Sequence, residues 1–128
     1  MVRKLFLIVL ILLGSFTYVS AAVHNVNAEE AWKILQSRSD IFLLDVRTPG
    51  EYFQVRLANA RLIPIDQLQR RVAEIPKGPV MIYCAVGSRS SAVANYLQRL
   101  GYPEVYNLYG GIWGWQLRGL PVLKGPGG

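Results

Sequence analysis

Cysteine and histidine are almost absent from this sequence of 128 residues, which contains one of each, Cys84 and His24. A single cysteine cannot form an intramolecular disulfide, and one cysteine with one histidine cannot supply the ligands of a structural zinc site. We therefore expect no metal and no other cofactor. His24 lies sixty residues before Cys84, so we expect no protease-like cysteine–histidine dyad but an exposed or edge-strand histidine.

Internal repeats, low-complexity blocks and runs of basic residues are also missing. Apolar residues make up 52% of the chain and charged residues 17%, a composition typical of a folded domain rather than a disordered chain. Without a basic run interleaved with aromatic side chains, nucleic acid is not an expected partner, although the net charge of +6 favours anionic ligands in general. The length fits one domain and is too short for two of ordinary size.

A long apolar run is present at the N-terminus. Arg3 and Lys4 precede an unbroken apolar stretch over residues 5–13, and small residues at 19–21 follow at the spacing that a signal peptidase recognises. We predict a signal peptide over residues 1–21, a folded domain over 22–122 and a flexible tail over 123–128. The alternative is an uncleaved membrane anchor, because residues 5–22 are nearly long enough to span a bilayer. Either interpretation predicts an exported domain, periplasmic or secreted, or anchored and facing outward.

Short apolar runs alternate with amphipathic segments along the rest of the chain. Strands are expected at 23–26, 41–44, 61–64, 80–83 and 105–108. Helices are expected after Asn27, around 51–54, from Asp66 (capped together with Gln69) to Ile75, over the segment that stops at Gly101, and over 112–117. This alternation predicts an α/β domain, with a parallel sheet covered by helices on both faces. Ligands of such sheets lie beyond the carboxyl ends of the strands, and Cys84 directly follows the strand at 80–83.

The segment after this strand carries the chemistry. The start of a helix presents unpaired N–H groups and the positive end of a dipole, which stabilise an anion. Gly87 permits a positive φ, so that successive N–H groups can curl around the anion, and Arg89 adds a permanent cation. Such surroundings lower the pKa of a thiol, so we interpret Cys84 as a reactive thiolate; the alternative is a small buried apolar residue. The predicted binding loop consists of Ala85, Val86, Gly87, Ser88, Arg89 and Ser90.

Several polar and aromatic side chains near this loop have competing interpretations. Asp45 and Arg47 are predicted to support the site, Asp45 by accepting loop N–H bonds or pairing with an arginine; the alternative is that they reach its mouth. Glu51 is expected to be a helix residue or an ion-pair partner. Helix capping is expected of Ser88 and Ser90, with a bond to a bound anion as the alternative. Three aromatic residues are candidates for a docking patch, although core packing is expected of at least one tryptophan: Tyr109, Trp113 and Trp115.

Three segments resemble signatures of the rhodanese family. Residues 43–52 (LLDVRTPGEY) resemble its LLDVRxxxEY motif, residues 80–90 (VMIYCAVGSRS) its active-site strand and loop, and residues 101–122 (GYPEVYNLYGGIWGWQLRGLPV) its C-terminal signature. The segments follow one another in the order of the family and span nearly all of residues 22–122. Two segments depart from the family pattern. Residues 55–60 (VRLANA) stand where Gly-His-Ile-x-Gly-Ala is usual, so that Val55 and Asn59 take the places of the two glycines, and Ala85 stands where a basic residue is frequent.

The resemblance implies an open five-stranded parallel sheet and a sulfurtransferase in which Cys84 becomes a persulfide. Its partners would be a small anionic sulfur donor, thiosulfate or a persulfide, and a thiol or cyanide acceptor. Because Ala85 carries no charge, thiosulfate is expected to be bound weakly. A non-catalytic rhodanese-like binding module is the first alternative. A phosphatase or arsenate reductase is the second, although those loops have the spacing Cys-x5-Arg rather than the Cys-x4-Arg found here. The oligomeric state stays open.

Overall fold

The computed structural model describes residues 14–15 and 22–126. The predicted signal peptide over residues 1–21 therefore lies outside the described residues, apart from Gly14 and Ser15, and so does the end of the predicted tail. Within the part of the chain that is described, no helix has both the length and the apolar character needed to cross a membrane.

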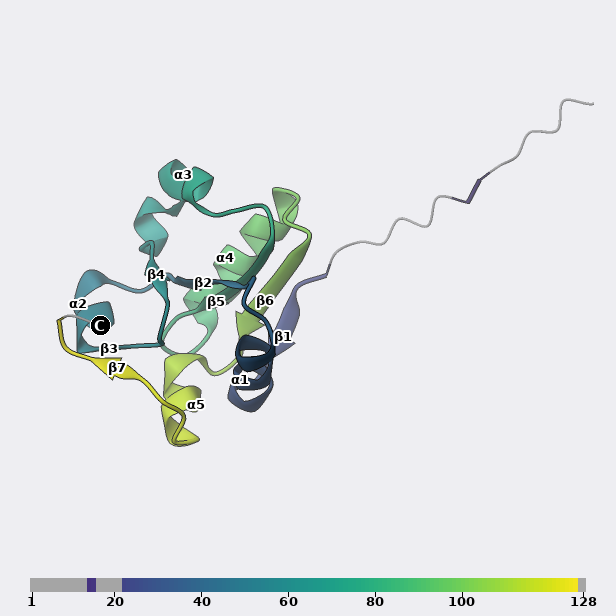
Figure 1. The fold of residues 1–128 in the computed structure, drawn as a ribbon. Coiled ribbons are helices and arrows are strands. Elements are labelled where there is room, and N and C mark those ends of the chain that lie inside the picture. Colours follow the sequence, from purple (N-terminus) through teal and green to yellow (C-terminus); the bar gives the residue numbers. More distant parts are fainter. Residues whose placement is uncertain (1–13, 16–21, 127–128) are drawn as a thin grey trace, which may run out of the picture.

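Five parallel strands form the central sheet, in the order β1-β6-β5-β2-β4 (Figure 1). They are β1 (His24–Val26), β2 (Phe42–Asp45), β4 (Arg61–Leu62), β5 (Pro79–Tyr83) and β6 (Glu104–Leu108). The central strand β5 is almost entirely buried, which requires the continuous apolar run seen before Cys84. The parallel α/β sheet predicted from the alternation of elements, with the five strands that the resemblance implied, is confirmed.

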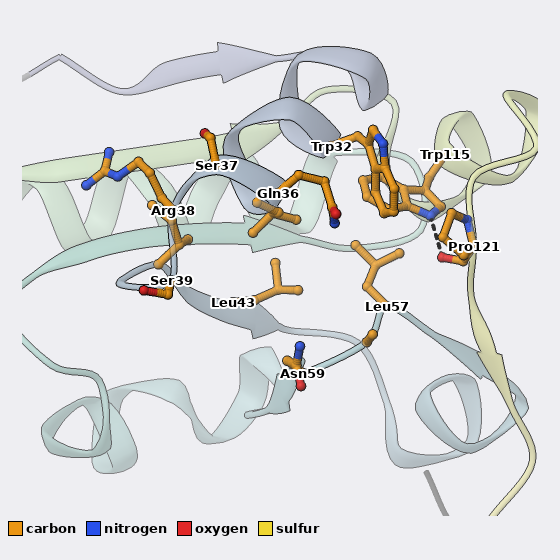
Figure 2. Close-up of a pocket in the computed structure, with 13 residues that line it drawn as sticks. Trp32, Gln36, Ser37, Arg38, Ser39, Leu43, Leu57, Asn59, Trp115 and Pro121 are labelled. Carbon is orange, nitrogen blue, oxygen red and sulfur yellow. Dashed lines mark hydrogen bonds between the residues drawn. The ribbon is translucent and has the colours of Figure 1, made fainter.

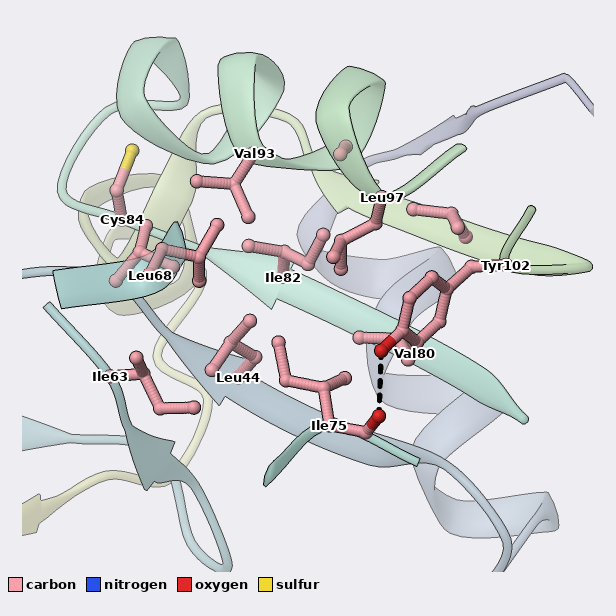
Figure 3. Close-up of a cluster of buried hydrophobic side chains, with 13 residues drawn as sticks. Leu44, Ile63, Leu68, Ile75, Val80, Ile82, Cys84, Val93, Leu97 and Tyr102 are labelled. Atoms are coloured by element: carbon pink, nitrogen blue, oxygen red, sulfur yellow. Dashed lines mark hydrogen bonds between the residues drawn. The ribbon is translucent and has the colours of Figure 1, made fainter. Parts of the chain in front are cut away.

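Two separate cores lie on the two faces of this sheet, because successive side chains of a strand point to opposite faces. Val80 and Ile82 of β5 belong to the core covered by α3 (Leu68–Arg71) and α4 (Ser88–Arg99), shown in Figure 3. Met81 and Tyr83 belong to the core covered by α1 (Ala28–Ser37) and α5 (Gly111–Leu117). Cys84 lies at the edge of the first core, beside α4.

The helix starts follow the expected caps in part. The side chain of Asn27 accepts a hydrogen bond from Glu30 N at 2.9 Å at the start of α1. The prediction that Ser88 or Ser90 caps α4 is wrong, because the residue before this helix is Gly87 in a left-handed conformation with no side-chain cap. The N–H groups that a cap would have bound are directed elsewhere, as described below.

The segment from Asp66 to Ile75 is not one capped helix as predicted. It consists of a 3-10 turn at Ile65–Gln67, the short α3, and a second 3-10 turn at Val72–Glu74. Asp66 lies inside the first turn, so its side chain cannot cap that turn from outside. The segment still buries Leu68 and Ile75 against the sheet, as its apolar pattern indicates.

The stretch that departs from the family pattern folds without strain at Val55. Val55 has an extended backbone (φ −157°), which any residue adopts, and Asn59 has the left-handed backbone (φ 65°) that asparagine tolerates. An unpredicted pair of short strands forms here: β3 (Val55–Arg56) pairs antiparallel with β7 (Leu123–Lys124). The first residues of the predicted tail thus pair with the stretch that follows α2 (Pro49–Gln54).

Candidate active site

Backbone and side-chain donors converge on the sulfur of Cys84 at the carboxyl end of β5. Gly87 N lies 3.1 Å from Cys84 Sγ and donates to it, and Ser90 N donates at 3.4 Å. Ser90 Oγ lies 3.3 Å from the same sulfur. The φ of +111° at Gly87 turns its N–H into the loop, a conformation that a residue with a Cβ rarely adopts. The predicted N–H cradle is therefore formed around the sulfur itself.

These hydrogen-bond donors and the burial of Cys84 have opposite effects on the pKa of its thiol. Cys84 is fully buried, and burial alone would raise its pKa. Hydrogen bonds from Ser90 Oγ, Ser90 N, Gly87 N and Val86 N to the sulfur favour the thiolate and outweigh burial, so the pKa of Cys84 lies below its ordinary value. The direction agrees with the sequence-based expectation, although the hydrogen-bond donors of the loop contribute more to it than the charge of Arg89 does.

A titration of the thiol tests this balance. The rate of alkylation by iodoacetamide should rise with pH through a midpoint below the ~8.5 of free cysteine, since the thiolate is the reacting form. Ser90→Ala removes one donor and leaves the burial, so its midpoint should move to higher pH. Ser91→Ala, in the same helical turn, is the matched control and should keep the wild-type midpoint. A wild-type midpoint at or above 8.5 would contradict the cradle.

The first turn of α5 holds the backbone of the loop from the other side. Ile112 N donates to Cys84 O at 3.0 Å, and Trp113 N donates to Ala85 O at 3.1 Å. Gly111, at φ +60°, lies so close that a Cβ on it would stand 2.3 Å from Ala85 O and 2.6 Å from Cys84 O. No local pattern in the sequence predicted this contact between Gly111 and the loop.

Arg89 is engaged by a carboxylate from another element. Its Nη1 and Nη2 donate to Glu51 Oε1 and Oε2 at 2.8 and 2.9 Å. The hydrogen bond from Arg89 is the main cause that lowers the pKa of Glu51 to about 2, with a further contribution from Thr48. The expected ion-pair role of Glu51 is confirmed, but its partner, a residue of the binding loop, was not foreseen. The capping-box pattern at Thr48 and Glu51 was the available signal for an anchored carboxylate.

Asp45 and Arg47 form a buried pair below the site. Arg47 Nη2 donates to Asp45 Oδ2 at 2.7 Å and to Val55 O at 2.6 Å, and Arg47 N donates to Asp45 Oδ1 at 2.9 Å. The side chain of Arg47 is 2% exposed and that of Asp45 is 0% exposed. Their hydrogen bonds join β2 to the start of β3, which is the structural interpretation predicted for them, rather than the alternative of reaching the mouth.

The remaining candidates divide between core and surface. Trp115 is buried and donates from Nε1 to Pro121 O at 2.9 Å, as expected of one tryptophan, whereas Trp113 and Tyr109 are 64% and 71% exposed. His24 lies on the edge strand β1 with its ring 5.2 Å from that of Tyr106, consistent with the role expected for it.

Figure 2 shows a separate cavity of about 600 Å³. It adjoins the core on the face of the sheet opposite to the core that contains Cys84. Its apolar wall includes Trp32, Leu57 and Trp115, which contribute to the core beneath α1 and α5. Arg38 lines its other end and is already bound to Asp40 and Glu104. The described side chains that line this cavity include no cysteine and no histidine, and the thiol of Cys84 lies in the core on the other face.

Comparison with known proteins gives a consistent result. A family model described as a rhodanese-like domain matches residues 27–118. A sulfurtransferase of Allochromatium vinosum is 38% identical over 106 residues, which are 82% of this chain and 99% of that protein. The thiosulfate sulfurtransferase GlpE of Coxiella burnetii is 38% identical over 88 residues, 68% of this chain and 81% of that protein. A rhodanese-related protein of Thermoplasma volcanium has a solved structure with 31% identity and a TM-score of 0.71, covering 78% of this chain and 97% of that one.

Proposed function

The chain belongs to the rhodanese-like domain family and is a rhodanese-type sulfurtransferase, and on this basis we propose that Cys84 carries the transferred sulfur as a persulfide. The observation that supports this proposal most is the convergence of Gly87 N, Ser90 N and Ser90 Oγ on the Cys84 sulfur. A site built around an anionic sulfur serves a nucleophile, whereas a non-catalytic binding module has no need of one.

The first half-reaction loads the cysteine. The Cys84 thiolate attacks the sulfane sulfur of the donor, and a new bond forms between Sγ and that sulfur. The sulfur–sulfur bond of the donor breaks, and its electron pair leaves with sulfite when the donor is thiosulfate, or with a thiolate when the donor is a persulfide. The lowered pKa of Cys84 supplies the attacking anion without a general base.

The second half-reaction transfers the outer sulfur from the Cys84 persulfide to the acceptor. An acceptor thiolate or cyanide attacks the outer sulfur of the persulfide, the bond between Sγ and that sulfur breaks, and Cys84 regains its electron pair as a thiolate. The loop N–H groups that bind the resting thiolate bind the leaving thiolate again, so the cradle stabilises the charge that develops on Sγ. The cysteine ends each cycle in the state in which it began.

We infer a preference for persulfide donors over thiosulfate from the mouth of the site. Ala85 and the 57% exposed Val86 carry no charge, and the guanidinium of Arg89 is paired with Glu51. Among the described residues of the loop, the one cation is thus paired and offers little attraction to a dianion, whereas the carbon chain of a persulfide donor can contact the apolar side chains.

Intact-mass measurement tests the function directly. Wild-type protein incubated with thiosulfate or with a small-molecule persulfide should gain one sulfur atom, about 32 Da, which cyanide then removes. Hydrolysis of a phosphate ester should stay at background, because the Cys-x4-Arg loop is one residue shorter than a phosphatase loop. If the folded protein gains no mass with either donor, the binding-module interpretation takes the place of this proposal.

We also propose that the domain is exported, on the basis of the basic residues, apolar run and small residues within 1–21. The mature protein should begin at Ala22 or Val23. N-terminal sequencing of protein recovered from an exporting bacterial host measures this. Recovery of Met1 in the membrane fraction would support the uncleaved anchor instead.

A further inference from the structure

Arg89 is the one cation in the loop sequence CAVGSRS. Its positive charge is neutralised by the carboxylate of Glu51, a residue of α2. Arg89 lies in the first turn of α4. After the larger effect of Glu51, the negative charge of Cys84 also raises the pKa of Arg89, so the guanidinium and the thiolate interact electrostatically. Both terminal nitrogens of Arg89 bind Glu51, one to each carboxylate oxygen, in the two-pronged geometry of a strong arginine–carboxylate pair. The two side chains are 34% and 31% exposed, so a bound donor at the mouth could meet them.

Glu51 is itself fixed before any donor arrives. Thr48 N and Thr48 Oγ1 donate to Glu51 Oε1 at 3.2 and 3.1 Å, and Glu51 N donates back to Thr48 Oγ1 at 3.2 Å. This reciprocal capping box ties the carboxylate to the first turn of α2, where Pro49 begins the helix. A carboxylate held in this way keeps the guanidinium in one position at little further entropic cost.

We propose that Glu51 is a positioning residue that sets the donor specificity of the site: by neutralising Arg89, it disfavours dianionic donors and leaves singly charged and neutral sulfane donors favoured. The inference rests on the proposed sulfur transfer at Cys84. A dianionic donor must either compete with Glu51 for Arg89 or bind beside an ion pair with no net charge. A donor with less charge depends less on attraction to Arg89, so the pairing weakens its binding less. Arg47, a neighbouring arginine, is paired with buried Asp45 and cannot substitute.

The pairing also persists under working conditions. The hydrogen bond from Arg89 lowers the pKa of Glu51 to about 2, so its carboxylate stays ionised at neutral and mildly alkaline pH. The discrimination should therefore be independent of pH between neutral and mildly alkaline conditions, and it should weaken with salt, which screens partly exposed charges.

Steady-state kinetics of Glu51→Gln with two donors tests the proposal. Thiosulfate is a dianion and benzenethiosulfonate a monoanion, and both release their sulfane sulfur by breaking one sulfur–sulfur bond. For Glu51→Gln, the KM for thiosulfate should fall about fivefold or more at low salt, because Arg89 regains its charge, while the KM for benzenethiosulfonate changes less. The fall in the thiosulfate KM should become smaller as the salt concentration is raised. For either donor, kcat should change less than KM.

Three further variants separate charge from structure. Glu51→Asp keeps the negative charge and should retain the wild-type preference. Thr48→Val disrupts the capping box while leaving both ion-pairing groups, so it controls for a less stable α2 and should lower the KM for thiosulfate far less than Glu51→Gln does. Combining Glu51→Gln with Arg89→Gln removes the freed cation and should cancel the gain.

The outcomes distinguish this proposal from the one on which it rests. If the thiosulfate KM of Glu51→Gln is unchanged, or if both donors respond equally, Glu51 has only a structural role and the inference is overturned. If wild-type protein forms no Cys84 adduct with either donor, the proposed function fails first. A gain that persists in the double variant would also overturn the inference, because the effect would not pass through Arg89.

Discussion

Replacement of Cys84 by serine is expected to reduce sulfur loading and turnover to background while leaving the protein folded. A serine hydroxyl is not ionised near neutral pH and does not form the sulfur–sulfur bond on which the transfer depends. Intact mass after incubation with a sulfane donor should show no gain of about 32 Da, and cyanide-dependent turnover should be lost in the same sample.

The fold should tolerate this change for a reason that only the structure shows. The side chain of Cys84 is fully buried, so serine places a hydroxyl in the core. Gly87 N, Ser90 N and Ser90 Oγ surround the position and can bond to that hydroxyl, and we expect a loss of stability of about 1 kcal/mol.

Cys84→Ala is the informative companion variant. It should abolish the adduct equally but cost more stability than serine, because the N–H groups of the loop lose their acceptor. Urea unfolding followed by circular dichroism measures the difference. A sulfur adduct that survives in either variant would mean that another group carries the sulfur, and the assignment of Cys84 would be wrong.

Replacement of Gly111 by alanine should damage stability and activity together. Alanine is disfavoured at φ +60°, and its Cβ would lie 2.3 Å from Ala85 O and 2.6 Å from Cys84 O, both backbone atoms that cannot move alone. We expect destabilisation of roughly 3 kcal/mol or more. The displaced loop should lower turnover by about 100-fold, because small misplacements of a reacting group are costly.

Gly114→Ala is the matched control within the same helix. Apart from the adjoining backbone of α5 itself, no atom lies within 4 Å of a Cβ at Gly114, so alanine there should be neutral or stabilising by about 0.5 kcal/mol through helix propensity. Urea midpoints and sulfur-transfer rates of the two variants should therefore move in different directions. Equal midpoints for the two variants would show that Gly111 does not clamp the loop.

Local patterns were enough to predict the elements around the site. The apolar run before Cys84 identified β5 because a strand buried on both faces has no polar positions to interrupt it. Asn27 marked the start of α1 because a cap satisfies N–H groups only a few residues away. The helix predicted from Asp66 to Ile75 was wrong in its start and its continuity. Asp66 fits a capping pattern, but the first turn begins at Ile65, so Asp66 lies within the turn and cannot cap it.

The sequence by itself determined the succession of the five sheet strands and most of the helices along the chain, the candidate nucleophile and the loop that follows it, because these depend on periodicity and on neighbours within about one helical turn. Only the tertiary structure decided what surrounds that loop. Glu51 meets Arg89 across 38 positions of the chain, and the contact of Gly111 with Ala85 and Cys84 depends on the packing of α5 against the end of β5. The net charge at the mouth and the rigidity of the cradle follow from those long-range contacts, which no local pattern encodes.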